Sequence, residues 1–236
     1  MDMRRILLCV LTFQLMACAE LQQVVNQLPQ TGTGIGNAEI AQGLREALNQ
    51  GIDRQVGKLS GENGFFNNQL VKIMLPEELQ KVDKTLRDVG LGSLADEGLK
   101  ILNRAAEDAV GAATPIFVDA VKGITFDDAK QILMGSDNAA TQYLERSTKA
   151  QLYDKFNPII KNSFQKVGAD QIWSNIITRY NNLPLTANVN PDLTDYTTNE
   201  ALAGVYTMIA IEEKEIRTKV ASRTTDLLRK VFSIQD

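Results

Sequence analysis

Residues 40–59, IAQGLREALNQGIDRQVGKL, repeat apolar side chains at steps of three and four residues. That spacing matches the 3.6-residue turn of an α-helix and places the apolar residues on one face. We therefore predict an amphipathic helix that buries this face against other parts of the chain. The residues on the face are Ile40, Leu44, Ala47, Gly51, Ile52, Val56 and Leu59.

The same period continues along the chain, and no stretch alternates apolar and polar residues as a half-buried strand does. Pro76 and Gly90 suit the first turn and the end of one further helix. We predict an all-α fold, a single multi-helix globular domain of eight to ten helices over residues 38–236. The helices expected after the first cover about residues 75–89, 93–110, 114–122, 125–134, 138–144, 158–167, 172–180, 198–216 and 223–232.

Some helix starts are marked by polar residues that accept hydrogen bonds from free backbone N–H groups. Thr125 with Asp128, and Thr197 with Glu200, have the spacing of a capping box. In this motif each of the two side chains accepts a backbone N–H of the first turn, so each pair predicts the start of a helix.

Two other helix starts are expected between residues 135 and 160. Ser136 or Asp137 is predicted to cap the helix that runs through Tyr143. Pro158 is predicted to open another helix, because proline fits a first turn and disrupts a helix interior.

The first 17 residues have the parts of a secretory signal: Arg4 and Arg5, then an apolar run from Ile6, then a small residue, Ala17. The run is shorter than the roughly 20 apolar residues that a membrane-spanning helix needs. We predict that residues 1–17 are a signal peptide removed on export. Residues 18–37 are rich in Gly, Gln and Thr and are predicted to form a flexible tether.

Leu15-Met16-Ala17-Cys18 resembles the processing site of bacterial lipoproteins. The resemblance implies that Cys18 becomes the N-terminus and carries a thioether-linked lipid, which would anchor the protein in a membrane. In such lipoproteins Asp after the cysteine is associated with the inner membrane, whereas this chain has Ala19. We expect a position in the cell envelope, on the inner leaflet of the outer membrane facing the periplasm. Alternatively, Cys18 is an ordinary residue after a cleaved signal.

Composition excludes several classes of function. The 236 residues include no histidine, so Ser-His-Asp and Cys-His hydrolases and His-rich zinc sites are ruled out. Removing residues 1–17 takes away Arg4, Arg5 and Asp2, which changes 25 basic and 29 acidic residues to 23 and 28, a net charge of −5. We expect no nucleic-acid partner. Cys9 lies in the signal and leaves Cys18 nothing to pair with, so no disulfide is expected.

Many of these segments resemble a bacterial family known as domain of unknown function 4197. The resemblance covers about residues 38–232 and implies an exported, often lipoprotein-like helical protein, without an assigned reaction or catalytic residue. It is carried by Gly64-Phe65-Phe66, Lys72-Ile73-Met74-Leu75-Pro76, Leu102-Asn103-Arg104-Ala105-Ala106-Glu107, Pro115-Ile116-Phe117, Asp127-Asp128-Ala129, Ile132-Leu133-Met134-Gly135, Ala139-Ala140-Thr141-Gln142-Tyr143, Asn157-Pro158-Ile159-Ile160, Glu212-Glu213-Lys214-Glu215-Ile216-Arg217, Arg223-Thr224-Thr225-Asp226-Leu227-Leu228 and Val231-Phe232.

Asn103, Arg104 and Glu107 form the candidate polar network, since Asn103 and Glu107 share one stripe of a helix and Arg104 can reach Glu107. The neighbouring alanines favour a packed helix, so we predict that the network fixes helix register rather than binding a ligand. Phe65 and Phe66, in a loop rich in Gly and Asn, either fill the core or contact a membrane. Filling the core is favoured, because aromatic rings bury a large area.

Other charged clusters have ordinary explanations. Glu212, Glu213 and Glu215 are predicted to lie on a solvated face, with Glu213 and Arg217 as an ion pair along the helix. We expect no metal site. The glycines between residues 32 and 36 do not follow a strand, so no nucleotide cofactor is expected either.

Three functions remain open. The first is a membrane-tethered, non-enzymatic protein that binds an envelope partner. The second is a helical binding protein for a lipid-like or apolar molecule, in a pocket lined by Phe117, Trp173 and Tyr180, with residues 181–195 as a lid. The third is an enzyme that uses two carboxylates, for which no specific pair is present. An enzyme is the least favoured of the three.

Overall fold

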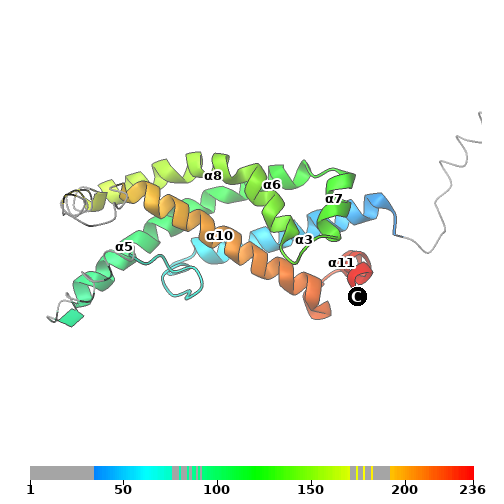
Figure 1. The fold of residues 1–236 in the computed structure, drawn as a ribbon, viewed down its shortest axis with the longest axis horizontal. Helices are drawn as coiled ribbons and strands as arrows, with labels where there is room; N and C mark the ends of the chain where they lie inside the picture. Colours follow the sequence, from blue (N-terminus) through cyan, green and yellow to red (C-terminus); the bar gives the residue numbers. More distant parts are fainter. Residues whose placement is uncertain are drawn as a thin grey trace, which may run out of the picture. The chain divides into compact units, whose positions relative to one another are not determined.

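The structure, a computed structural model, describes residues 35–75, 80, 84, 87, 88, 90, 92–170, 174, 178, 182 and 192–236. The chain divides into two units, Met1–Gly36 and Asn37–Asp236. All helices in the described residues belong to the second unit (Figure 1). The predicted signal peptide, Cys18 and nearly all of the predicted tether lie outside the described residues.

The described residues form α-helices and short 3-10 segments and contain no strand, which confirms the all-α fold. The α-helices are α3 (Asn37–Ser60), α5 (Gly92–Val110), α6 (Thr114–Lys122), α7 (Phe126–Leu133), α8 (Ala139–Gln165), α10 (Leu193–Thr218) and α11 (Asp226–Phe232). The 3-10 segments are η1 (Gly111–Ala113), η2 (Val220–Ser222) and η3 (Ser233–Gln235).

The predicted number of helices was too high for the described residues, which hold seven α-helices. Pro158 does not open a helix but lies inside α8, which joins two predicted helices into one. An interior proline costs about 3 kcal/mol. Four fully buried side chains at steps of four, Leu152, Phe156, Ile160 and Phe164, offset this cost, since each contributes about 1.5–3 kcal/mol. The predicted helices at 75–89 and 172–180 lie mostly outside the described residues.

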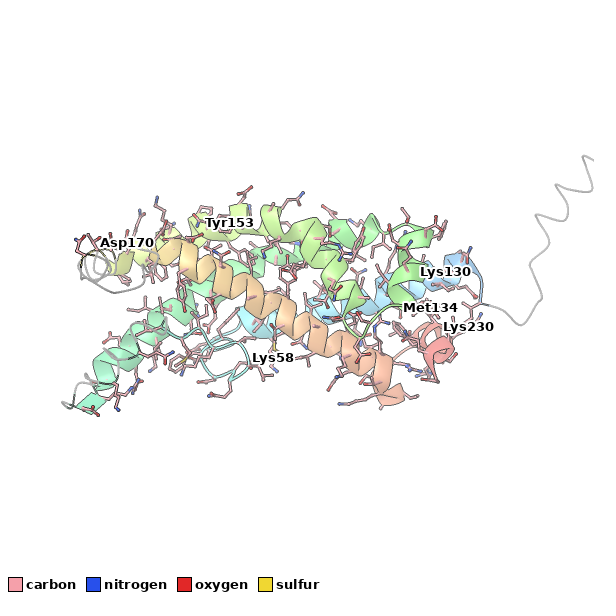
Figure 2. All side chains as sticks on the ribbon, viewed as in Figure 1. Lys58, Lys130, Met134, Tyr153, Asp170 and Lys230 are labelled. Carbon is pink, nitrogen blue, oxygen red and sulfur yellow. The ribbon has the colours of Figure 1, made fainter. Side chains whose placement is uncertain are left out.

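Helix α3 confirms the prediction for residues 40–59, and every predicted apolar position on its face is buried. In Figure 1, α10 runs alongside α8, while α7 and α11 lie against α3; these pairs are in contact. Helix α10 also packs on α3, and α5 packs on α8. Charged side chains such as Lys58, Lys130 and Lys230 point outward (Figure 2).

The two predicted capping boxes have different outcomes. Thr125 and Asp128 form the predicted box at the start of α7, where Asp128 N donates to Thr125 Oγ1 over 3.1 Å. The pair Thr197 and Glu200 does not start a helix. Helix α10 begins five residues earlier than predicted, at Leu193, and is capped by Asp192; Leu193 is buried and extends the apolar face.

Candidate functional site

Asn103 and Glu107 fix the loop of residues 61–75 to α5. Asn103 Oδ1 accepts the backbone N–H of Ile73 at 2.8 Å, and its Nδ2 donates to Ile73 O at 2.9 Å. Glu107 accepts the N–H of Asn63 at 3.2 Å and the N–H of Phe65 at 3.1 Å. Both side chains are buried. The polar atoms of both side chains therefore hold the loop in place.

Arg104 differs from its two neighbours because its side chain is 57% exposed. Its guanidinium lies 3.5 Å from Glu107 Oε2 and 3.2 Å from Asp108 Oδ1. Arg104 thus covers the outer side of Glu107 while part of its guanidinium faces solvent. Of the three predicted network residues, it is the one placed to meet a partner.

Phe65, in the same loop, is fully buried. Its ring lies against Gly204 of α10, where an added Cβ would come within 2.7 Å of Phe65 Cε1. Gly64 also has no room for a side chain, since a Cβ there would overlap the carbonyl oxygens of Lys58 and Leu59. Phe66 is only partly buried, with Lys72 Nζ 4.0 Å above its ring. Phe65 thus fills the core as predicted.

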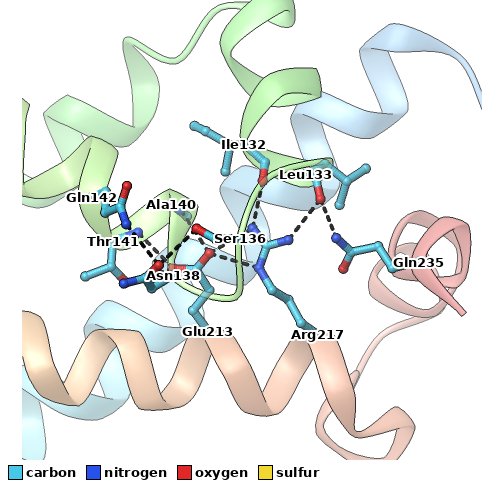
Figure 3. Close-up of polar contacts among 10 residues, drawn as sticks. All are labelled: Ile132, Leu133, Ser136, Asn138, Ala140, Thr141, Gln142, Glu213, Arg217 and Gln235. Carbon is cyan, nitrogen blue, oxygen red and sulfur yellow. Dashed lines mark hydrogen bonds and ion pairs between the residues drawn. The ribbon is translucent and has the colours of Figure 1, made fainter.

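Glu213 and Arg217 of α10 form a buried network that joins three helices (Figure 3). Glu213 accepts the backbone N–H groups of Ala140 and Thr141, at 2.9 and 2.8 Å, in the first turn of α8. Arg217 donates to Glu213 Oε1 at 2.8 Å and to Leu133 O at 2.9 Å, at the end of α7. The ion pair was predicted, but a solvated face for Glu213 was wrong.

This network replaces the cap that was predicted for α8. The residue before the helix, Asn138, makes no side-chain capping bond, and the predicted caps Ser136 and Asp137 lie outside the helix. The free N–H groups of a helix start need an acceptor. Here a carboxylate from another helix supplies it, and its negative charge also suits the positive end of the α8 dipole.

Glu212 is also buried and joins α10 to α3. Its Oε1 accepts Arg54 Nη1 at 2.5 Å, and its Oε2 accepts Gln55 Nε2 at 2.7 Å. The predicted solvated face is therefore wrong for Glu212 as well. Glu107, Glu212 and Glu213, the buried carboxylates of the described residues, are each engaged by two or more donors.

The end of α10 is held by a buried arginine in the turn that follows. Arg223 donates to Ile216 O at 3.0 Å and to Arg217 O at 2.8 Å, two carbonyls of the last turns. Its guanidinium also pairs with both carboxylate oxygens of Asp236 at 2.7 Å. This hydrogen-bonded pair lowers the pKa of Asp236.

Acid is expected to weaken the fold through this pair. Because the pKa of Asp236 is lowered on folding, its stabilising effect is complete above its ordinary value of 3.8 and is lost as pH falls through the lower folded value. Urea unfolding of the chain and of Asp236→Asn should therefore give midpoints that differ at pH 6 and converge below pH 3.8. Asp119→Asn, at an exposed carboxylate, is the control. A difference that stays constant with pH would contradict the expectation.

Two tyrosines join α8 to α10. Tyr153 Oη donates to Asp195 Oδ1 at 2.6 Å, and this bond raises the tyrosine pKa to about 12. The Tyr206 hydroxyl lies 2.8 Å from Thr148 Oγ1, and burial raises the pKa of Tyr206 to about 12. Phe117 is fully buried, with its ring edge-on to Tyr206 at 5.9 Å between ring centres. Both tyrosine hydroxyls are thus neutral near pH 7.

Of the predicted apolar pocket of Phe117, Trp173 and Tyr180, the structure describes only Phe117. The other two residues lie outside the described residues. Phe117 packs in the core and lines neither the groove along α3 nor the groove between α5 and α8. One interior void, between α3, α8 and α10, measures about 10 Å³, room for at most one water. The predicted lid, 181–195, is also mostly outside the described residues.

Two surface grooves are larger than the interior void between α3, α8 and α10. One runs along α3, measures about 840 Å³ and is lined by seven polar residues, Gln42, Arg45, Glu46, Asn49, Gln50, Asp53 and Arg54. Several of these side chains are engaged by neighbouring elements; Arg54, for example, pairs with Glu212. The other groove lies between α5 and α8, measures about 370 Å³ and is lined by Glu97, Lys100, Ile101, Arg104, Ala105, Asp108, Ser163, Lys166 and Val167.

The groove between α5 and α8 is the candidate functional site. It contains Arg104, the exposed member of the predicted network, and adds Lys100, Lys166 and an apolar floor. The sequence analysis missed Lys166 and Val167, which lie about 60 positions further along the chain and reach the site only because α8 packs on α5. No group of three or more Cys, Asp or Glu side chains that could hold a metal ion occurs in the described residues.

The described residues hold no single helix that is long and apolar enough to cross a membrane. One helix pair with a 106° bend, Asp96–Lys122 with Phe126–Leu133, reaches the required length and composition together.

Comparison with known proteins gives one match. No curated protein and no solved structure matches the chain. A family model described as "Protein of unknown function (DUF4197)" matches residues 34–233. This span includes every α-helix whose bounds the described residues give, and the candidate groove. The chain therefore belongs to the DUF4197 family, as its sequence segments predicted.

Proposed function

We propose that the chain is an exported lipoprotein, anchored in the bacterial envelope through an acylated Cys18, and that it acts there as a non-enzymatic binding protein. The observation that carries the non-enzymatic part is the hydrogen bonding of three buried carboxylates, those of Glu107, Glu212 and Glu213. Each of these buried carboxylates accepts hydrogen bonds that hold a loop or a helix in place. A carboxylate that works as a general acid or base must instead reach a substrate.

The grooves agree with this proposal. Neither the α3 groove nor the groove between α5 and α8 is lined by any of the three buried glutamates. With no histidine in the chain, the usual general base near neutral pH is missing as well. These observations argue against the carboxylate-dependent enzyme and leave surface recognition as the better-supported role.

The anchor part of the proposal depends on the N-terminal sequence. Cys18 follows Leu15-Met16-Ala17 directly after an apolar run, which is the arrangement of a lipoprotein processing site. The residue that follows, Ala19, favours the inner leaflet of the outer membrane, with the domain facing the periplasm. Acylation would hold the helical domain close to that surface, where its partners are membrane or envelope components.

A second candidate function is binding of a lipid-like molecule. The groove between α5 and α8 favours it, because its volume of about 370 Å³ falls within the usual range of ligand sites, about 300–1,000 Å³. The pocket that this function was first expected to use lies mostly outside the described residues, which place only Phe117, in the core.

The anchor is tested by replacing each cysteine in turn. We expect Cys18→Ser to lose the acyl mass in intact mass spectrometry and to change its membrane fractionation in the native host. Cys9→Ser is the matched control, because Cys9 lies within the predicted signal, and it should behave as the native chain does. The proposal fails if Cys18→Ser is processed and fractionates as the native chain does. A stoichiometric lipid-like adduct on the native protein would favour the second candidate.

A further inference from the structure

We infer that the groove between α5 and α8 binds a single-chain amphiphile with an anionic headgroup. This inference rests on the proposed binding function and gives it a site and a ligand class. The headgroup would lie between Lys100 and Lys166, and the chain would lie along Ile101 and Val167.

The apolar part of the groove is open to a ligand. Val167, near the end of α8, is 53% exposed, although valine is usually buried. Ile101, of α5, is partly exposed in the same groove, whereas Ala105, which also lines it, is itself buried. Covering these side chains with an acyl chain removes apolar surface from water, which is favourable.

The charges of the groove select the headgroup. Its lining holds three cations, Lys100, Arg104 and Lys166, and two carboxylates, Glu97 and Asp108. Asp108 is already engaged, because it accepts from Ser163 Oγ at 3.0 Å and pairs with Arg104 at 3.2 Å.

The two lysines are the groups left for an anion. In the part of the chain that the structure describes, neither ammonium forms an ion pair with a carboxylate. Lys100 lies 5.6 Å from the centre of the Phe66 ring, and its charge is among those that lower the pKa of Asp96, one helical turn earlier. An anionic headgroup would give both lysines a close ion-pair partner at the edge of an apolar surface, where such pairs are less screened than in open water.

The helix arrangement explains why a groove forms at this place. In Figure 1 the N-terminal part of α5 turns away from the C-terminal part of α8, while the other parts of the two helices are packed. The groove is therefore a consequence of the crossing of two helices and not of one flexible loop.

The test uses the full-length protein in phosphatidylcholine nanodiscs and a palmitate analogue that carries a photoreactive diazirine on its chain. Cross-links are mapped by mass spectrometry. We expect them on the segments 97–108 and 163–167. Val167→Glu should lower the cross-link yield at least tenfold, because it places a negative charge on the apolar floor. Val220→Glu, at another exposed valine, is the matched control and should leave the yield unchanged.

The charge requirement has its own variants and probes. Lys166→Gln should lower the yield at least threefold, whereas Lys161→Gln, on the exposed surface of α8 outside the groove, should not change it. A diazirine analogue with an alcohol headgroup should cross-link at least fivefold less. Competition with dodecanoate and with dodecyl phosphate then distinguishes a carboxylate ligand from a phosphate ligand.

The inference is overturned if Val167→Glu and Val220→Glu cross-link equally, if the alcohol probe is as effective as the acid, or if cross-links map elsewhere. These outcomes are separate from those of the anchor test. Loss of groove labelling with an intact acyl mass on Cys18 would remove the site and keep the lipoprotein. Groove labelling of a native protein that carries no acyl mass on Cys18 would keep the site and remove the lipoprotein.

Discussion

Replacing Glu213 with glutamine is expected to lower the free energy of unfolding by about 3–5 kcal/mol, the usual cost of removing one charge of a buried ion pair. Arg217, whose side chain is 3% exposed, would keep its charge without a counter-ion. For a domain of about 200 residues this corresponds to a fall in melting temperature of roughly 6–20 °C. Circular dichroism during heating and during urea titration measures both quantities.

The loss has a second cause at the start of α8. The carboxylate accepts two backbone N–H groups and the hydroxyl of Thr141, all within 2.9 Å. A glutamine side chain has one carbonyl oxygen and would direct its NH₂ group toward at least one of these donors. Buried donors left without an acceptor cost about 1–3 kcal/mol each.

Glu215→Gln is the matched control, because Glu215 lies two positions along the same helix, with its side chain 42% exposed. Its pair with Lys219 is a surface ion pair and should contribute less than about 1 kcal/mol. The double variant Glu213→Gln with Arg217→Met should be more stable than the sum of the single changes predicts, since it removes the unpaired charge. Equal effects of Glu213→Gln and Glu215→Gln would contradict the structural role assigned to Glu213.

The sequence predicted helices well where their signals are local. The step pattern of residues 40–59 and the box of Thr125 and Asp128 each depend on neighbours within a few positions, and both are present in the structure. The start of α8 could not be predicted in this way. Its acceptor, Glu213, is 73 positions from Ala140, and only the packing of α10 against α8 brings them together.

A pattern for the buried glutamates was nevertheless present. Glu213 is four residues after Ile209 and three before Ile216, so it lies on the apolar stripe of α10. An acidic residue on such a stripe, with an arginine four positions later, indicates a buried ion pair rather than a solvated face. The groove between α5 and α8 had no comparable pattern, because it depends on the angle between two helices, which local sequence does not specify.

Replacing Phe65 with alanine is expected to cost about 3–5 kcal/mol, as usual for a fully buried phenylalanine. The ring fills a space bounded by Gly204, which has no side chain to close the cavity. The loop is also held by Glu107, so it is not free to collapse into the space. Urea unfolding monitored by circular dichroism gives the change in free energy.

Phe66→Ala is the matched control, because it makes the same change one position later. Phe66 is partly buried, and its contact with Lys72, 4.0 Å from the ring centre, is worth about 0.5–1 kcal/mol at an exposed site. The two variants also separate the roles considered for these aromatics. A residue that fills the core affects unfolding of the isolated protein, whereas a residue that contacts a membrane affects only vesicle binding. If Phe65→Ala left stability unchanged and weakened vesicle binding instead, the core position of its ring would be wrong.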